Sequence, residues 1–219
     1  MERVPEPEIM DNPERAQAYA DADFSEVNAS FVERLLELAG DLARARMLDL
    51  GTGPGDIPLR IAPRRPGWRI AGLDASMPML RLGQAARRGV STAPAHQSVL
   101  ADAKRTPFAD DTFDVIFSNS ILHHVDDPVA FWKEAARVAK PGALLFVRDL
   151  LRPESPEAAR DLVETYAKDE HSLLKEDFYN SLLAAYTISE VHDQIHLEGI
   201  QAAKVSQCGD RHFDVVIRV

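Results

Sequence analysis

Leu48-Asp-Leu-Gly-Thr-Gly-Pro-Gly-Asp56 is the stretch of sequence that decides the fold. The apolar run that ends at Leu50 predicts a strand, and a helix is expected to begin at Asp56. Gly51, Gly53 and Gly55 lie between them, and glycines adopt positive φ without strain and let a ligand approach the backbone. A glycine-rich turn between the first strand and the first helix of a βαβ series is typical of nucleotide-binding sheets, so this turn predicts a cofactor site.

The residues on both sides of this turn predict strands that alternate with helices. Apolar runs predict strands at residues 47–50, 69–73, 97–100, 113–118, 143–148, 203–207 and 212–219. Helical spacing and capping patterns predict helices at residues 14–20, 25–40, 56–62, 77–88, 129–139, 156–168, 176–185 and 187–198. The alternation favours an α/β fold, with a mostly parallel sheet covered by helices on both faces. Cys208-Gly-Asp-Arg211 predicts a hairpin, which makes the last strand antiparallel.

The organisation into domains follows from the same pattern. Residues 1–24 are polar and contain Pro5, Pro7 and Pro13, so we expect an N-terminal arm. Residues 25–219 are expected to fold as one domain, with a helical insertion at about residues 156–198. A chain of 219 residues buries enough surface to fold without disulfides or metal.

The composition excludes several classes of protein. No stretch approaches the roughly 20 apolar residues of a transmembrane helix. The single cysteine, Cys208, excludes an internal disulfide, and the first residues lack a signal-peptide pattern, so a cytoplasmic location is expected. The net charge is −10 and the basic clusters are short, which favours a neutral or cationic small ligand over nucleic acid.

Two carboxylates indicate which ligand the glycine-rich turn binds. The spacing of the glycines is one residue shorter than the G-x-G-x-x-G pattern of dinucleotide sites. Asp49 precedes the first glycine, where a carboxylate repels a pyrophosphate but suits an ammonium group. Asp74 ends the second strand, where a carboxylate accepts hydrogen bonds from ribose hydroxyls. These residues predict an adenosine with a cationic tail, and S-adenosylmethionine fits that description.

Five motifs, in order along the chain, resemble those of a known family. They are Leu48–Gly55, Gly72-Leu-Asp-Ala-Ser-Met-Pro-Met-Leu80, Ala101-Asp-Ala-Lys-Arg-Thr-Pro-Phe108, Asp111-Thr-Phe-Asp-Val-Ile-Phe-Ser118 and Lys140-Pro-Gly142. Over roughly residues 25–150 the chain resembles the class I S-adenosylmethionine-dependent methyltransferases, in the small-molecule branch that includes ubiquinone/menaquinone- and sterol-type enzymes. The resemblance implies a Rossmann-like seven-stranded sheet. It also implies methyl transfer to a small molecule with release of S-adenosylhomocysteine.

The same resemblance implies roles for individual residues in binding the cofactor. Asp49 and Gly51 would face its methionine end, Asp74 would accept from the ribose, and Asn119 would lie beside the sulfonium. Tyr19 would either close the site from the arm or fix the arm to the core. The remaining cofactor-binding residues that it implies are Thr52, Gly53, Gly55, Ala75, Met79, Asp102 and Ala103, of which Asp102 and Ala103 would bind adenine.

Candidates for acid–base chemistry follow the fourth and fifth predicted strands. His123 or His124 would act as a base if the acceptor carries an acidic proton; otherwise an imidazole packs against the loop or lines the cofactor pocket. Asp149 would orient the acceptor, or would cap the next helix or form an ion pair. His192 and His196 have the spacing of a zinc pair, but the sequence places no third ligand, so no metal is expected.

Two other functions remain open from the sequence alone. The first is an NAD(P)-dependent oxidoreductase on a Rossmann-like fold, which the glycine spacing and Asp49 disfavour. The second is a non-catalytic cofactor-binding protein, which the presence of Asp49, Asp74 and Asp102 disfavours.

Overall fold

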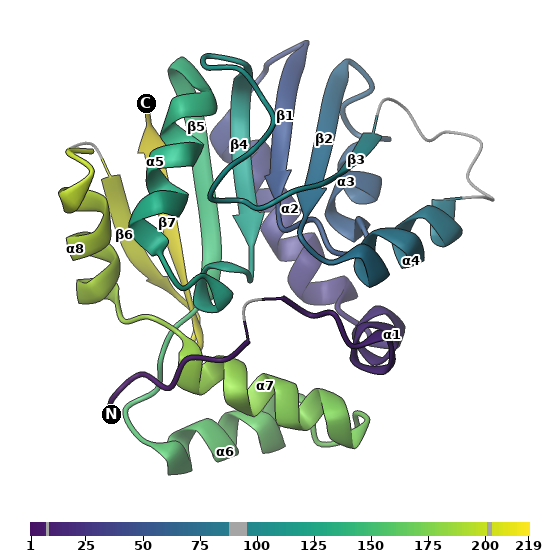
Figure 1. The fold of residues 1–219 in the computed structure, drawn as a ribbon, viewed down its shortest axis with the longest axis vertical. Coiled ribbons are helices and arrows are strands. Elements are labelled where there is room, and N and C mark those ends of the chain that lie inside the picture. Colours follow the sequence, from purple (N-terminus) through teal and green to yellow (C-terminus); the bar gives the residue numbers. More distant parts are fainter. Residues whose placement is uncertain (8, 88–95, 201–202) are drawn as a thin grey trace.

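A single seven-stranded sheet runs through the computed structural model, which describes residues 1–7, 9–87, 96–200 and 203–219 (Figure 1). The strands are β1 (Ala45–Leu50), β2 (Trp68–Asp74), β3 (His96–Leu100), β4 (Phe113–Asn119), β5 (Ala139–Leu150), β6 (Ala203–Cys208) and β7 (His212–Arg218). Their order in the sheet is β3-β2-β1-β4-β5-β7-β6. Strand β1 therefore lies between β2 and β4, and the sheet grows away from it in both directions. A crevice that suits a ligand opens at the carboxyl ends of strands where the order reverses in this way.

The strand directions confirm the predicted fold class. Strands β1 to β5 pair in parallel, whereas β7 is antiparallel to both β5 and β6. The hairpin between β6 and β7 turns at Gly209, whose φ of 70° suits glycine. Arg148 on β5 and Asp214 on β7 form a buried ion pair, with Nε–Oδ1 and Nη2–Oδ2 distances of 2.6 and 2.9 Å, so a charged contact joins the last strand to the parallel part.

The helices lie close to their predicted positions. They are α1 (Pro13–Asp21), α2 (Ser25–Ala39), α3 (Asp56–Ile61), α4 (Met77–Arg87), α5 (Pro128–Val138), α6 (Pro156–Tyr166), α7 (Ser172–Ala184) and α8 (Ile188–Leu197), with a 3₁₀ turn η1 (Leu122–His124). The expected end of α4 at Arg88 lies outside the described residues. In the described part of the chain, no helix is both long enough and apolar enough to cross a membrane.

Two predicted boundaries were wrong by four residues. Helix α7 begins at Ser172 rather than at residue 176, because the side chain of His171 accepts a hydrogen bond from Leu173 N and caps the helix. Strand β5 begins at Ala139 rather than at residue 143. Gly142 has a positive φ of 82°, and the pairing of β5 with β4 shifts in register nearby. The strand therefore continues through an irregularity whose sequence is typical of a turn.

Helices cover both faces of the sheet, and the core is divided accordingly. On one face α5 and α8 pack on the sheet, with Trp132 and Ile195 buried against it. On the other face α2 and α3 contribute Phe31 and Ile61. A third, smaller cluster joins α6 and α7 to Leu150 at the end of β5. Because both faces are covered, β1 and β4 in the middle of the sheet are buried at most of their positions.

The N-terminal arm lies across the carboxyl ends of the parallel strands (Figure 1). Helices α1, α6 and α7 lie at the same end of the sheet, and α1 contacts both α4 and α7. The arm is fixed by backbone and side-chain hydrogen bonds: Val4 N donates to Leu183 O at 3.0 Å, and Arg3 donates to the carbonyl oxygens of Ala184 and His123. The carboxyl end of the sheet is therefore covered by segments that are far apart in the sequence.

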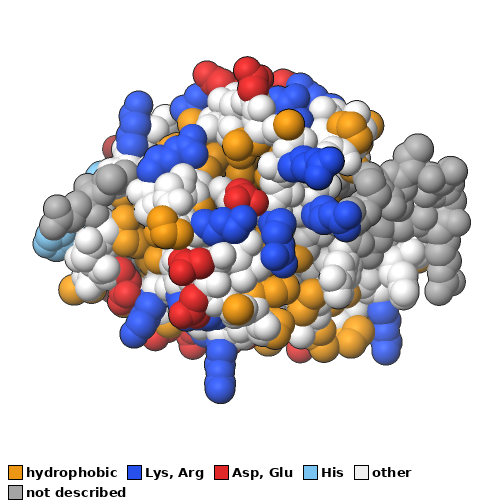
Figure 2. Space-filling model, turned by 90° about the horizontal axis from the view of Figure 1, so that it is seen from above, with side chains coloured by type: hydrophobic (Ala, Val, Ile, Leu, Met, Phe, Trp, Pro, Cys, Tyr) orange, Lys and Arg blue, Asp and Glu red, His pale blue; other side chains and the backbone are white. Residues whose placement is uncertain are grey.

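The opposite end of the molecule has a different character. Figure 2, which views the amino ends of the parallel strands, shows Lys and Arg side chains gathered on that face. Lys140 there pairs with Asp114, whose carboxylate also accepts from Arg46 N. The face with these Lys and Arg side chains and the end of the sheet that the arm covers are thus on opposite sides of the molecule.

Candidate functional site

The glycine-rich turn after β1 is held close to its neighbours by backbone hydrogen bonds. Gly51 N and Thr52 N both donate to Leu73 O, at 2.8 and 2.9 Å, which joins the turn to the end of β2. Gly51 has a φ of 75°, and a Cβ atom added there would lie 2.2 Å from Cγ2 of Ile121. Only glycine satisfies both the backbone angle and the close approach at this position.

Two cavities flank this turn. Their volumes are about 160 and 170 Å³, and both are lined by Tyr19, Gly51, Gly53 and Asn119. Since these four residues are common to both, the cavities lie on either side of them and form one elongated site at the β1/β4 switch of strand order. An elongated site made of two adjoining cavities suits a ligand that has two distinct ends.

The first cavity lies between β2, α4 and the arm, and Asp74 is its central polar residue. Asp74 Oδ2 accepts from Gly53 N at 2.7 Å, and Oδ1 accepts from Ser76 N at 2.8 Å. Burial nevertheless raises the pKa of the Asp74 carboxyl above its ordinary value. The arm covers this cavity with Ile9 and Met10, and Ser76 Oγ donates to Met10 O at 2.8 Å.

The other residues of the first cavity include several that the sequence predicted. They are Ala75, Met79, Asp102, Ala103 and His124. Asp102 is exposed, and its Oδ1 accepts from Lys104 N at 2.7 Å. Asp102 and Ala103 both line the cavity, so the turn at residues 102–105 brings a carboxylate to it.

The second cavity contains buried polar atoms that have no partner. Asp49 Oδ2, Thr52 Oγ1 and Asn119 Oδ1 make no hydrogen bond with any residue that the structure describes. Burial raises the pKa of Asp49 to about 7, against a lowering effect of the neighbouring Thr52 hydroxyl, and the charge of Asp74 adds to the increase. Buried polar groups are normally paired, so these three atoms indicate a ligand with hydrogen-bond donors at this place.

Two residues at the middle of the site connect strand and helix. Asn119 Nδ2 lies 3.4 Å from Asn28 Oδ1, so the end of β4 reaches α2. Ser120 follows with a φ of 59°, an angle that a non-glycine residue rarely adopts, and its N–H donates to Arg148 O at 2.9 Å. Backbone strain of this kind is concentrated at functional sites. Tyr19 of α1 is half-buried and stands over the middle of the site.

The two histidines of η1 have different surroundings. His123 is buried, and its Nδ1 lies 2.5 Å from Oδ1 of Asp149, to which it donates because a carboxylate only accepts. Burial raises the pKa of Asp149, but the charge and hydrogen bond of His123 outweigh it and hold that pKa below its ordinary value. His124 lines the first cavity, and burial lowers its pKa to about 3.

The structure thus brings most of the predicted site residues together around the two cavities. Gly55, His123 and Asp149 are the exceptions among them: Gly55 precedes α3 with a φ of 84°, and the other two lie behind the cavity wall. Sequence reasoning did not find Ile9 and Met10, since nothing in a polar, proline-containing arm indicates what it covers. It also missed Asn28 and Ser76, although a serine two residues after Asp74 is a recognisable turn signal.

Comparison with known proteins agrees with this geometry. Residues 48–147 match the model of the family described as "Methyltransferase domain". A demethylmenaquinone methyltransferase of Roseiflexus sp. (strain RS-1) is 35% identical over 122 residues, which cover 54% of this chain and 48% of the relative. A ubiquinone/menaquinone biosynthesis C-methyltransferase of Geotalea daltonii is 37% identical over 109 residues, 49% of this chain and 46% of the relative. The chain therefore spans about half the length of the curated relatives it matches.

Solved structures share the fold over nearly the whole chain. A S-adenosylmethionine-dependent methyltransferase from Aquifex aeolicus superimposes with a TM-score of 0.70 at 22% identity and covers 94% of this chain and 97% of its own. At this identity the similarity shows the fold alone. The family match and the curated relatives show similarity in sequence, and the family match includes the glycine-rich turn. Residues 48–147 are therefore similar in sequence to the methyltransferase-domain family, and nearly the whole chain shares its fold with solved methyltransferases.

Proposed function

We propose that the protein transfers a methyl group from S-adenosylmethionine to a small-molecule acceptor and releases S-adenosylhomocysteine. The observation that carries the proposal is the set of unpartnered buried oxygens of Asp49, Thr52 and Asn119 beside the glycine-rich turn. These are acceptors at one end of an elongated site, and the α-ammonium group of the cofactor is a donor that carries positive charge. The curated relatives of about 35% identity are themselves named as methyltransferases.

The residues of the site fit the rest of the cofactor as well. Asp74 Oδ1 and Oδ2 each accept one backbone N–H, and each retains lone-pair capacity for a ribose hydroxyl. Met79 and Ala75 line the same cavity and offer apolar surface to a sugar or a base. Asp102 and the N–H of Ala103 provide an acceptor and a donor, the pair that the edge of adenine requires. We therefore assign the first cavity to adenosine and the second to the methionine end.

In the proposed reaction the protein mainly positions groups and excludes water. When bound, S-adenosylmethionine supplies a sulfonium methyl that is already reactive toward a nucleophile. Asn119 and Tyr19 stand where both cavities meet, so we assign them to orienting the reacting groups. The arm covers this region, and a covered site that holds two reactants in line contributes several kcal/mol to a transfer reaction.

The two histidines have separate roles in this proposal. Because His123 is buried behind the cavity and hydrogen-bonded to Asp149, we assign both to holding η1 in place rather than to contact with the acceptor. Asp149 also accepts from Leu122 N at 2.6 Å, which ties η1 to β5. His124 is the histidine that faces the cavity, and it remains the candidate for contact with the acceptor.

A small molecule suits the site better than a nucleic acid. Carboxylates of Asp49, Asp74 and Asp102 line the cavities and would repel a phosphate backbone. The Lys and Arg side chains seen in Figure 2 stand at the amino ends of the strands, away from the cavities. The comparisons give no support to an oxidoreductase or to a cofactor-binding protein without activity.

We also propose that residues 25–219 act as one domain covered by the arm.

The experiment that tests the proposal is a pair of measurements on the purified chain. Calorimetric titration with S-adenosylhomocysteine and with NAD separates a methyltransferase from an oxidoreductase, and we expect binding of the first only. A metabolite extract incubated with methyl-labelled S-adenosylmethionine should then yield a labelled small molecule by mass spectrometry. Binding of NAD alone would overturn the assignment of the cofactor, and binding of S-adenosylhomocysteine without any labelled product would overturn the assignment of activity.

A further inference from the structure

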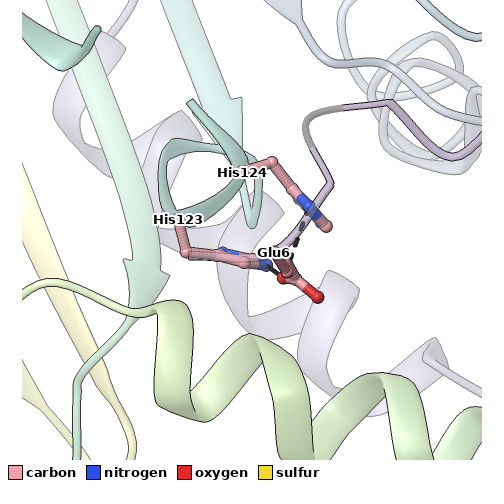
Figure 3. A group of neighbouring side chains, drawn as sticks. All are labelled: Glu6, His123 and His124. Atoms are coloured by element: carbon pink, nitrogen blue, oxygen red, sulfur yellow. Dashed lines mark ion pairs between the residues drawn. The ribbon is translucent and has the colours of Figure 1, made fainter. Parts of the chain in front are cut away.

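Three side chains that the cofactor does not need converge beside the site: Glu6, His123 and His124 (Figure 3). Glu6 comes from the arm, whereas both histidines come from η1, so the cluster joins segments more than 100 residues apart. Glu6 Oε1 lies 3.6 Å from Nε2 of His123 and 3.3 Å from Nδ1 of His124. Within the described part of the chain, this is the group of three side chains whose ligand atoms all lie within 4.8 Å of one another.

These distances are close to those between the ligands of one metal ion. Two nitrogens and an oxygen bound to a tetrahedral zinc ion with bonds of about 2.1 Å stand about 3.4 Å apart. Glu6 already lies at that separation from both histidines, so a small inward movement of His123 and His124 would complete the set. Two imidazoles and one carboxylate are a donor set that binds zinc, iron or another first-row metal and leaves a coordination position open.

The surroundings of His123 support this reading independently. Its Nδ1 donates to Asp149, so Nε2 is the nitrogen that faces Glu6, and a metal ion bound there would take the place of a proton on Nε2. Asp149 is itself fixed by Leu122 N and Leu150 N, at 2.6 and 2.7 Å. A histidine that binds a metal through one nitrogen typically donates from the other to a carboxylate, which fixes its orientation.

The charges around the cluster leave room for a cation. Glu6 and Asp149 are two carboxylates, and both are largely buried. Arg3 is near them, but its guanidinium donates to the carbonyl oxygens of Ala184 and His123 and lies over the ring of Tyr186. Ser181 Oγ also donates to Glu6 at 2.9 Å. A divalent ion between Glu6 and the two histidines would bring two positive charges, which balance the charges of the two carboxylates.

We propose that Glu6, His123 and His124 bind a divalent first-row transition metal ion, for which Zn²⁺ is the probe, and that the bound ion fastens the arm over the site. Nδ1 of His124 lies 3.3 Å from Pro7 O as well as from Glu6, so in the metal-free protein this nitrogen donates to one of these oxygens. The metal takes the place of that proton. The inference does not rest on methyl transfer, because Glu6 and His123 are not assigned to contact with the cofactor or the acceptor, and His124 is named only as a candidate for contact with the acceptor.

Zinc binding to the full chain, after treatment with a chelator and dialysis, tests the proposal. Calorimetry is expected to give one equivalent of Zn²⁺ bound, and Co²⁺ in its place should give the visible absorption of a four- or five-coordinate site. Glu6→Gln and His124→Ala should each weaken binding by at least about tenfold, since each removes a ligand. Circular dichroism of the variants verifies that they remain folded, and Glu6→Gln preserves the size of the side chain.

The matched control uses the other histidines that can bind zinc. His192 and His196 are exposed on α8, and an i,i+4 pair of this kind binds zinc weakly without a third ligand. The His192→Ala/His196→Ala variant should still bind one equivalent of Zn²⁺. If binding is lost in this control, or if Glu6→Gln binds as tightly as the original chain, the proposed site is wrong. Absence of saturable binding would likewise overturn it and leave a hydrogen-bonded cluster.

A second measurement addresses the arm directly. Hydrogen–deuterium exchange of residues 3–7 should slow when Zn²⁺ is added to the original chain, because the ion ties Glu6 to η1. The same addition should leave exchange in Glu6→Gln unchanged. Equal exchange with and without the metal in the original chain would contradict the fastening of the arm, even if zinc binds.

Discussion

The buried carboxylate of Asp49 lowers the stability of the folded protein, although we assign it to binding the ligand. Its carboxyl group is buried without a partner for Oδ2, and its pKa is raised to about 7. In an unfolded chain the pKa is about 4, so between pH 4 and 7 the folded protein binds more protons at this residue than the unfolded chain. The free energy of unfolding therefore decreases as the pH rises through this interval, and the whole penalty is present above pH 7.

Replacement of Asp49 by asparagine should consequently stabilise the protein at about pH 8 by roughly 1–3 kcal/mol, and much less at about pH 5. The same change should weaken binding of S-adenosylhomocysteine, because the α-ammonium group loses a negative partner. Urea unfolding at both pH values and calorimetry check the two effects. A loss of stability in Asp49→Asn at pH 8 would show that the carboxylate has a partner in the folded protein.

Asp74 illustrates the opposite case, a carboxylate that folding already uses. Both of its oxygens accept backbone N–H groups from residues that shape the site. Asp74→Ala should weaken the binding of S-adenosylhomocysteine by about 1–3 kcal/mol, through lost contacts with the ribose and through orphaned N–H groups. Calorimetry measures the change, with Asp193→Ala on the exposed face of α8 as the control. Unchanged affinity would remove Asp74 from the site.

At the scale of the element, the cap of α8 is a feature of stability alone. Thr187 and Glu190 form a reciprocal capping box, in which Glu190 N donates to Thr187 Oγ1 at 3.3 Å and Thr187 N donates to Glu190 at 2.8 Å. Helix α8 packs Val191 and Ile195 on the sheet, at a distance from both cavities. A change at the cap therefore separates stability from binding.

Thr187→Ala should lower the free energy of unfolding by about 0.5–2 kcal/mol, the usual cost of losing a helix cap. The affinity for S-adenosylhomocysteine should stay the same. Thermal unfolding and calorimetry give the two numbers, and Ser189→Ala, at an exposed position of the same first turn, is the control that should change neither. Weaker binding in Thr187→Ala would mean that α8 is coupled to the site.

At the scale of the whole molecule, the arm is the segment that connects the parts. It contacts α7 through Val4, η1 through Arg3 and Glu6, and the first cavity through Ile9 and Met10. A chain that lacks residues 1–11 loses the cover of the first cavity but keeps the three buried clusters of the core. The arm should therefore contribute more to ligand retention than to folding.

Removal of residues 1–11 should weaken the affinity for S-adenosylhomocysteine by about tenfold, which corresponds to about 1.4 kcal/mol, mainly through faster dissociation. Stopped-flow displacement measures the rate, and thermal unfolding should show only a small decrease in Tm. Ser76→Ala, which removes only the hydrogen bond to Met10 O, should have a smaller effect in the same direction. An unchanged dissociation rate in the shortened chain would show that the arm does not cover the ligand.

The whole molecule also shows which features the sequence could predict. The sheet and the glycine-rich turn were predictable because their signals are local: apolar runs, caps, and Gly51 with its neighbours between a strand and a helix. Asp49 and Asp74 could be placed for the same reason, since strand ends meet at one edge of a parallel sheet. The roles assigned to these residues in binding remain predictions.

The contacts of the arm could not be predicted, and the reason is physical. Glu6 lies more than 100 residues from His123, and a polar, proline-containing segment has no periodic pattern that would indicate its partners. His123 and His124 were found as candidates by their position after β4. In the structure, His123 is buried against Asp149 and His124 faces the cavity. These orientations depend on the conformation of the 3₁₀ turn η1, which its three residues do not determine by themselves.

The position of the arm's partners has a consequence for biosynthesis. Ribosomes add about 5–20 residues per second, so Arg3 and Val4 emerge roughly ten seconds or more before Leu183 and Ala184, to which they bind, exist. During that interval β1 to β5 can already assemble, while the crevice at their ends is open to any small solute. The arm is thus translated well before the segments to which it binds, and the nascent domain passes through a stage at which a ligand can enter unobstructed.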